Sequence, residues 1–195
     1  MSYIIQDINK GIKPMQDDRI EDYTRVTNIL SMYSDYDSIP EAVLQKAAER
    51  GQSIHSLCEL YARDGIRMPS EFDGYVEGFV TWFNREKVEV YELETRLFCE
   101  TFEITGQYDI YAKLANGDDY IIDIKTCAAK HKTWPVQLAA YQYLYGENRE
   151  GLMPRRAVLH LKKDGKYKFY EYDNDDKDLD LFMSCLKLHR YFKKD

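Results

Sequence analysis

An aspartate and a lysine lie two residues apart at the end of a short apolar run, residues 121–126. The run has the composition of a β-strand, on which alternate residues share a face, so Asp123 and Lys125 point the same way while Ile122 and Ile124 face the core. An acid and a lysine placed in this way can hold a divalent cation beside an anionic substrate. Taken alone, the pair is equally compatible with a cross-strand ion pair on the surface.

A second aspartate, Asp109, precedes this run and joins Asp123 only if the two strands pair in the right register. A two-residue loop between the strands would pair Asp109 with Ile124 and turn the carboxylates to opposite faces. A three-residue loop at 115–117 pairs Asp109 directly with Asp123, and Gly117 supplies the positive φ that such a loop needs at its last residue. We therefore expect the three-residue loop, or an equivalent bulge.

Further polar residues lie at spacings that suit a catalytic site. His55 and Glu59 are four apart in a predicted helix and share one of its faces, as do Gln137 and Tyr141 in a later helix. Glu94, on the first predicted strand, is a third acid that could lie near a metal. Each also has a simpler interpretation: a satisfied core histidine, a polar helix face and a solvated strand residue.

A basic segment directly follows the strand that carries Asp123 and Lys125. Lys130 and Lys132 suit contacts with phosphate groups, and Trp134 suits stacking on an unpaired base. The alternatives are a solvated loop for the two lysines and core packing for the tryptophan.

The elements that must position these residues follow from hydrophobic periodicity and from turn residues. Helices are predicted over 41–63, 70–85, 135–145 and 176–192, and strands over 88–99, 102–114, 120–126, 157–162 and 167–172. Residues 1–22 are polar and contain helix breakers, which predicts an irregular N-terminal arm. The order of elements indicates an α+β fold, and residues 1–195 are expected to form a single domain.

Composition excludes several classes of protein. The 195 residues carry a formal charge of −7, which excludes a histone-like protein that coats nucleic acid, although an acidic metal site and a local basic groove can share one chain. The 4 cysteines contain no C-x-x-C pair, which disfavours a zinc ribbon or a redox motif. Neither a membrane span nor a secretory signal is visible, so we expect a cytoplasmic protein.

Taken in order, these motifs resemble the PD-(D/E)XK nuclease superfamily, and within it the RecB-like exonuclease branch that includes many phage exonucleases and the CRISPR-adaptation nucleases. The resemblance covers roughly residues 23–172 and rests on the order of Gly51…His55, Glu94, Gly106-x-x-Asp109, Asp123-x-Lys125 and Gln137-x-x-x-Tyr141. Tyr108 stands where the superfamily name has proline. Cys185 is the one cysteine near the C-terminus, so the iron–sulfur cluster of some members is not expected.

The resemblance implies a mixed central β-sheet flanked by helices, and a role for each matched residue. The implied metal ligands are the side chains of His55, Asp109 and Asp123 and the carbonyl of Ile124. Lys125 would orient the attacking water and neutralise developing charge, Gln137 and Tyr141 would position Lys125 and the substrate strand, and Glu94 would support the metal or its waters. This ligand set of hard oxygens and one imidazole suits Mg²⁺ or Mn²⁺.

The implied function is metal-dependent hydrolysis of DNA by an exonuclease, in recombination, repair or phage DNA processing. The substrate would be DNA with free ends, and a recombination partner or a homo-oligomer is compatible with the sequence. Two alternatives stay open. The same site could serve an endonuclease or a flap-processing enzyme, or the fold could bind DNA or a partner without cutting.

Overall fold

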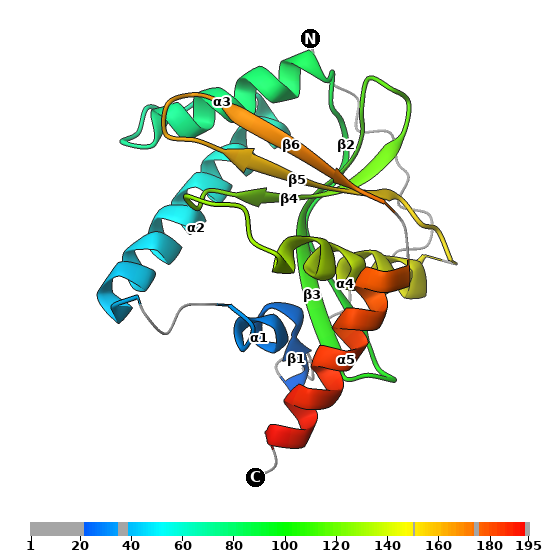
Figure 1. Ribbon diagram of the computed structural model, residues 1–195. Helices are drawn as coiled ribbons and strands as arrows, with labels where there is room; N and C mark the ends of the chain where they lie inside the picture. The colour runs from blue at the N-terminus through cyan, green and yellow to red at the C-terminus, as the bar shows by residue number, and fades with distance from the viewer. Residues whose placement is uncertain (1–21, 35–38, 150, 174–175, 194–195) are drawn as a thin grey trace.

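The computed structural model describes residues 22–34, 39–149, 151–173 and 176–193 (Figure 1). Its elements are, in order, β1 (Thr24–Arg25), α1 (Val26–Ser31), α2 (Glu41–Asp64), α3 (Asp73–Arg85), β2 (Glu89–Cys99), β3 (Ile104–Lys113), β4 (Asp119–Lys125), α4 (Thr133–Asn148), β5 (Arg155–Leu161), β6 (Tyr167–Tyr172) and α5 (Asp176–Phe192). Apart from Asp22, the expected N-terminal arm lies outside the described residues. Among the described helices, none is long and apolar enough to span a bilayer.

The strands form one mixed sheet in the order β1-β3-β4-β5-β6, with β2 also paired to β3. The β4–β5 and β1–β3 pairs are parallel, and the other pairs are antiparallel. The parallel β4–β5 connection runs through α4, which is the crossover that two neighbouring parallel strands require. The expected mixed sheet flanked by helices is therefore confirmed.

The long strand β3 changes neighbours along its length. One edge pairs with β2 from end to end, from Cys99 opposite Ile104 to Glu89 opposite Lys113. The other edge pairs with β1 at Ile104 and with β4 from residue 110 onward. On that edge, residues 106–109 lie beyond the pairing with β1 and before the pairing with β4, so the sheet has a gap there.

Helices cover both faces of the sheet (Figure 1). One core cluster packs α1, α4 and α5 against one face and includes Tyr108, Ile121 and Val158. The other packs α2 and α3 against the opposite face and includes Ile122 and Ile124. This division explains why β4 is buried at every position between its two end residues, Asp123 included: a strand covered on both faces buries both sets of its side chains.

The predicted elements are all present, and the differences lie at their ends. Two short elements ahead of α2, β1 and α1, were not predicted as a strand and a helix. Helix α3 begins at Asp73 rather than Ser70, because Ser70 and Asp73 form a hydrogen-bonded turn in front of it. Helix α4 continues to Asn148, beyond the predicted end at residue 145, and a left-handed glycine follows at Gly151.

Candidate active site

The register between β3 and β4 is the one that brings the two aspartates together. Ile110 lies opposite Ile122, and the hydrogen bond from the Leu114 amide to the Asp118 carbonyl closes a three-residue loop. Gly117 ends that loop with a φ of 86°. The predicted loop is therefore confirmed, and the same register continued by one residue places Asp109 opposite Asp123.

Asp109 is a buried carboxylate that joins three elements. Its Oδ1 lies 3.1 Å from Nδ1 of His55 on α2, and its Oδ2 accepts a hydrogen bond from the backbone amide of Ile124 on β4. The partner of His55 is thus Asp109 rather than Glu59, which instead forms an ion pair with Arg63 at 3.0 Å. A histidine of α2 thus contacts an aspartate of β3.

Glu94 completes a group of possible metal ligands. One ligand atom each from His55, Glu94 and Asp109 lies within 4.8 Å of the others. Glu94 has a φ of 47° in the middle of β2, a left-handed conformation that costs energy in a residue other than glycine. Gln107 donates to its Oε2 at 2.7 Å and holds the side chain in place.

Asp123 and Lys125 form a second group beside the first. Oδ2 of Asp123 lies 2.7 Å from Nζ of Lys125, and both side chains are mostly buried. Gln137 bridges the pair, because its Nε2 donates to Oδ1 of Asp123 at 3.0 Å and its Oε1 accepts from Nζ of Lys125 at 3.2 Å. The same Nε2 lies 2.8 Å from the hydroxyl of Tyr141. One turn of α4 therefore holds the aspartate and the lysine at the end of β4.

Gly106 allows α4 to approach β3 this closely. A Cβ at this position would lie 2.7 Å from the ring of Tyr141, closer than side chains tolerate. A glycine three residues before Asp109 thus leaves space for the tyrosine that bonds Gln137. The packing gives a physical reason for the spacing Gly106-x-x-Asp109.

The electrostatics of the site reflect its excess of negative charge. Burial and the charge of Asp109 raise the pKa of both Asp123 and Glu94, and for Asp123 they outweigh the lowering by Lys125. Burial also opposes ionisation of Asp109, but His55 and the Ile124 amide lower its pKa. Burial opposes protonation of His55 as well, yet Asp109 raises its pKa to about 9. Nearby carboxylates likewise keep Lys125 protonated against its burial, with a raised pKa.

These residues fit a divalent cation. Three carboxylates and one imidazole supply hard oxygen ligands and a single nitrogen, the donor set that suits Mg²⁺ or Mn²⁺. A cation would also relieve the repulsion that raises the pKa values of Asp123 and Glu94. The clustered ligand atoms come from His55, Glu94 and Asp109, whereas the Asp123 carboxylate is engaged by Lys125 and Gln137. The Ile124 backbone adjoins the site through its amide, and its carbonyl stays a predicted ligand.

A cavity of about 200 Å³ opens beside Asp109, and its lining includes residues that no sequence motif had marked. It is lined by Arg25, Val26, Thr27, Arg96, Thr105, Gly106, Gln107, Asp109 and Tyr141. Arg96 donates to Gln107 at 3.2 Å, and Gln107 in turn donates to Glu94, so one arginine is linked to the acidic group. No local motif marked the arginines, because Arg25 comes from β1 and Arg96 from β2, opposite Gln107.

The basic segment after β4 is only partly available to a ligand. Lys130 and Lys132 are both exposed, and Nζ of Lys130 lies 4.5 Å from the ring centroid of Tyr170. The expectation that Trp134 stacks on a base is wrong for this conformation, because its side chain is 3% exposed. It packs between His131 and His160 and belongs to the core.

Comparison with known proteins gives a fold. No family model matches the chain, and no curated protein matches its sequence. A solved structure of a candidate exonuclease from Eubacterium rectale matches with a TM-score of 0.56 at 12% identity, over 93% of this chain and 85% of that one. The chain shares the fold of that structure, and this fold is the mixed β-sheet flanked by helices that the motifs predicted.

Two other solved structures match over similar lengths with lower scores. An alkaline exonuclease from Laribacter hongkongensis has a TM-score of 0.46 at 10% identity, over 88% of this chain and 91% of that one. A phage-related exonuclease from Haemophilus somnus has a TM-score of 0.46 at 10% identity, over 87% of this chain and 92% of that one. At these identities the chemistry must be argued from the residues of this chain.

Proposed function

We propose that this protein is a divalent-metal-dependent nuclease that hydrolyses phosphodiester bonds in DNA, most simply as an exonuclease. The observation that carries the proposal is the convergence of His55, Glu94 and Asp109 on one point, directly beside the Asp123–Lys125 ion pair. A cation site and a protonated lysine side by side serve the two needs of a phosphate ester under attack by water: activation of the water and stabilisation of negative charge.

His55, Glu94, Asp109 and Asp123 would hold the metal, which when bound supplies Lewis acidity and lowers the pKa of a water. Lys125 stays protonated, because the neighbouring carboxylates raise its pKa. It therefore acts as a fixed positive charge and proton donor toward a phosphate oxygen rather than as a general base. Gln137 orients the ammonium group of Lys125, because its side-chain amide hydrogen-bonds both Lys125 and Asp123.

The cavity lined by Arg25 and Arg96 would receive the phosphate of the DNA strand. It borders Asp109, the carboxylate that His55 and the Ile124 amide hold in place. Arginine binds phosphate through several N–H groups at once, and Thr27 adds a hydroxyl donor. These groups supply local positive charge to a chain whose net charge is −7, which reconciles an acidic protein with an anionic substrate.

The test is cleavage of end-labelled linear DNA and of closed circular DNA with Mg²⁺ or Mn²⁺, comparing wild type with Asp123→Asn. The matched control is Asp180→Asn, an exposed aspartate on α5. Loss of linear DNA alone, abolished only by Asp123→Asn, supports an exonuclease. Cleavage of the circle shows an endonuclease, and no cleavage of either substrate contradicts the proposal in favour of a module that binds without cutting.

A further inference from the structure

A second cavity lies at the other end of β4, away from the candidate active site. Its volume is about 240 Å³, and it is lined by Tyr111, Asp118, Asp119, Leu152, Met153, Pro154 and Arg155. Asp119 is the first residue of β4 and Lys125 is the last, so the two sites are separated by about 20 Å of extended strand. A ligand in this cavity would leave the nuclease site free.

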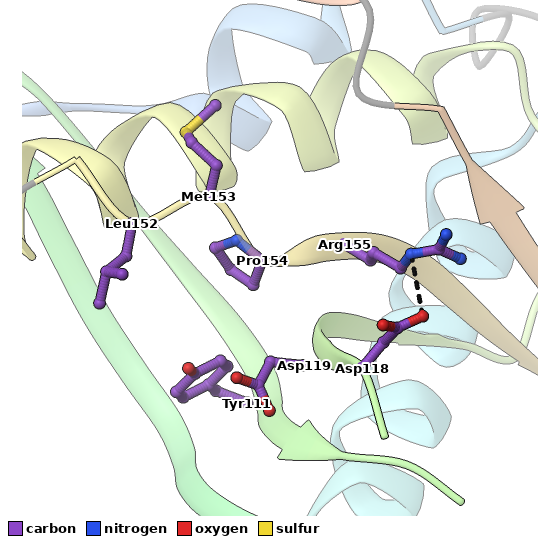
Figure 2. Close-up of a pocket in the computed structure, with 7 residues that line it drawn as sticks. All are labelled: Tyr111, Asp118, Asp119, Leu152, Met153, Pro154 and Arg155. Atoms are coloured by element: carbon purple, nitrogen blue, oxygen red, sulfur yellow. Dashed lines mark ion pairs between the residues drawn. The ribbon is translucent and has the colours of Figure 1, made fainter. Parts of the chain in front are cut away.

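Figure 2 shows that the cavity has two unlike walls. Leu152 and Pro154 form an apolar wall, and Tyr111 and Asp119 face them with an aromatic ring and a carboxylate. The ion pair between Asp118 and Arg155 closes one end, whereas Met153 points away from the space between the walls. An occupant must therefore combine an apolar stem with a group that suits a carboxylate and an aromatic face.

Asp119 is the carboxylate without a cation. Arg155 neutralises Asp118 at 3.2 Å and also lies 3.4 Å from Glu171. In the described part of the chain Asp119 has no ion pair, although Lys113 lies opposite it in the sheet, and its Oδ1 is shielded from solvent with no hydrogen-bond partner. Burial and the Asp119 carboxylate raise the pKa of Tyr91 to about 12, so the side chain beside this carboxylate is a neutral hydroxyl, and the position still favours a ligand that brings positive charge.

The rim of the cavity is apolar and exposed. Leu152 is 59% exposed and Met153 is 55% exposed, in the turn that follows Gly151. Large exposed apolar side chains around a recessed carboxylate are typical of a protein interaction site. At such sites an arginine or aromatic anchor enters a pocket, and apolar contacts surround it.

The molecule already contains the pairing that would fill this cavity. The guanidinium of Arg149 lies 5.4 Å from the ring centroid of Tyr145 and donates to Glu92 at 2.8 Å. Tyr145 packs against Tyr111, with ring centroids 4.9 Å apart. The cavity thus presents a tyrosine and a carboxylate, as the Arg149 site does, with no arginine of this chain bound to them.

We propose that the cavity at the start of β4 is a docking site for an arginine side chain of a partner protein. The guanidinium binds Asp119 and lies over Tyr111, its stem packs between Leu152 and Pro154, and a neighbouring apolar residue of the partner packs on Met153. Arginine fits better than lysine, because a planar guanidinium both stacks on an aromatic ring and offers several donors to one carboxylate.

The experiment uses the full chain labelled with ¹³C at its methionine methyl groups and follows the Met153 signal, assigned with Met153→Leu. The probe is a capped Gly-Arg-Leu-Gly peptide, and the control peptide carries neutral citrulline in place of arginine. We expect a saturable shift with a dissociation constant on the order of 1 mM. Citrulline and the variant Asp119→Asn should each weaken binding by about tenfold, and Asp180→Asn should leave it unchanged.

The other outcomes overturn the proposal. An absent or unsaturable shift, or equal binding by the citrulline peptide or by Asp119→Asn, removes the arginine site. Agmatine binding as tightly as the peptide would assign the cavity to a small guanidinium compound. Sedimentation showing a wild-type dimer that Asp119→Asn dissociates would assign it to a second copy of this chain.

Discussion

An acid–base ion pair lies at each end of β4, and the two pairs differ in solvent exposure and in their hydrogen-bond partners. At the end of the strand, the Asp123 and Lys125 side chains are 6% and 23% exposed and both bond Gln137. At the start, Asp118 and Arg155 are 47% and 55% exposed and close one end of a cavity. Solvent screens charges only where it reaches them. The buried acid–base pair therefore interacts strongly and is held in place, whereas the exposed pair interacts weakly.

The sharpest test of this difference is the loss of a single charge at each end. Asp123→Asn should reduce the rate of DNA hydrolysis by at least about 10² to 10³-fold, the effect of removing one preorganised group from a buried site. Asp118→Asn should change the rate by less than about twofold, because its charge is screened and distant from the metal ligands. Initial rates on linear DNA with saturating Mn²⁺ measure both.

A folding defect would confuse that comparison, so thermal unfolding of both variants must accompany the rates. If Asp118→Asn lost as much activity as Asp123→Asn while both stayed folded, the two ends of β4 would be coupled and their separation would be wrong.

The next largest effect is a pH dependence at the buried end alone. Only neutral His55 can bind a metal, and Asp109 raises its pKa to about 9, so protons compete with the metal below that pH. Affinity for Mn²⁺ should therefore rise as pH rises, by about tenfold per unit between pH 7 and 9, and level off above. The electron paramagnetic resonance signal of free Mn²⁺, recorded under nitrogen, gives the dissociation constant.

His55→Gln is the matched variant for this titration. It should bind Mn²⁺ with little dependence on pH over the same interval, because no proton has to leave. A wild-type affinity that stays flat from pH 7 to 9 would show that His55 is no ligand.

A smaller effect, on stability, tests how tightly the buried end is packed. Gly106→Ala places a Cβ 2.7 Å from the Tyr141 ring and should lower the free energy of unfolding by about 1–3 kcal/mol. Gly51→Ala is the control. Gly51 lies within helix α2, and a Cβ there would have one neighbour, Thr126 Oγ1 at 3.7 Å, an ordinary contact distance. That variant should be stabilised by up to about 1 kcal/mol. Urea unfolding of both variants decides whether Gly106 is required by this contact.

Residues whose geometry is set by local rules were predictable from the sequence. The register of β3 and β4 followed from loop length and from the need for positive φ at Gly117, and the structure has both. The shared face of Gln137 and Tyr141 followed from helical spacing, and one amide does bond both Tyr141 and Asp123. Such features depend on neighbours in the chain.

Features that depend on tertiary contacts were not predictable. Spacing alone places His55 beside Glu59; its contact with Asp109 joins residues 54 apart in the chain, and only the family resemblance had grouped the two as metal ligands. Trp134 is in a basic segment yet buried, because α4 begins beneath β5 and β6. Arg25 and Arg96 join the site from elements distant in sequence, and no spacing rule connects them to Asp109.

The smallest expected effect is at the exposed end. A double-mutant cycle with Asp118→Asn and Arg155→Gln should give a coupling of about 0.2–1 kcal/mol in the free energy of unfolding, which falls as salt is added. Both side chains are about half exposed, so little desolvation strengthens the pair. A coupling well above that range, unchanged by salt, would mean that this end of β4 is as rigid as the other. That end of the cavity would then be preformed, and arginine binding there would need no rearrangement.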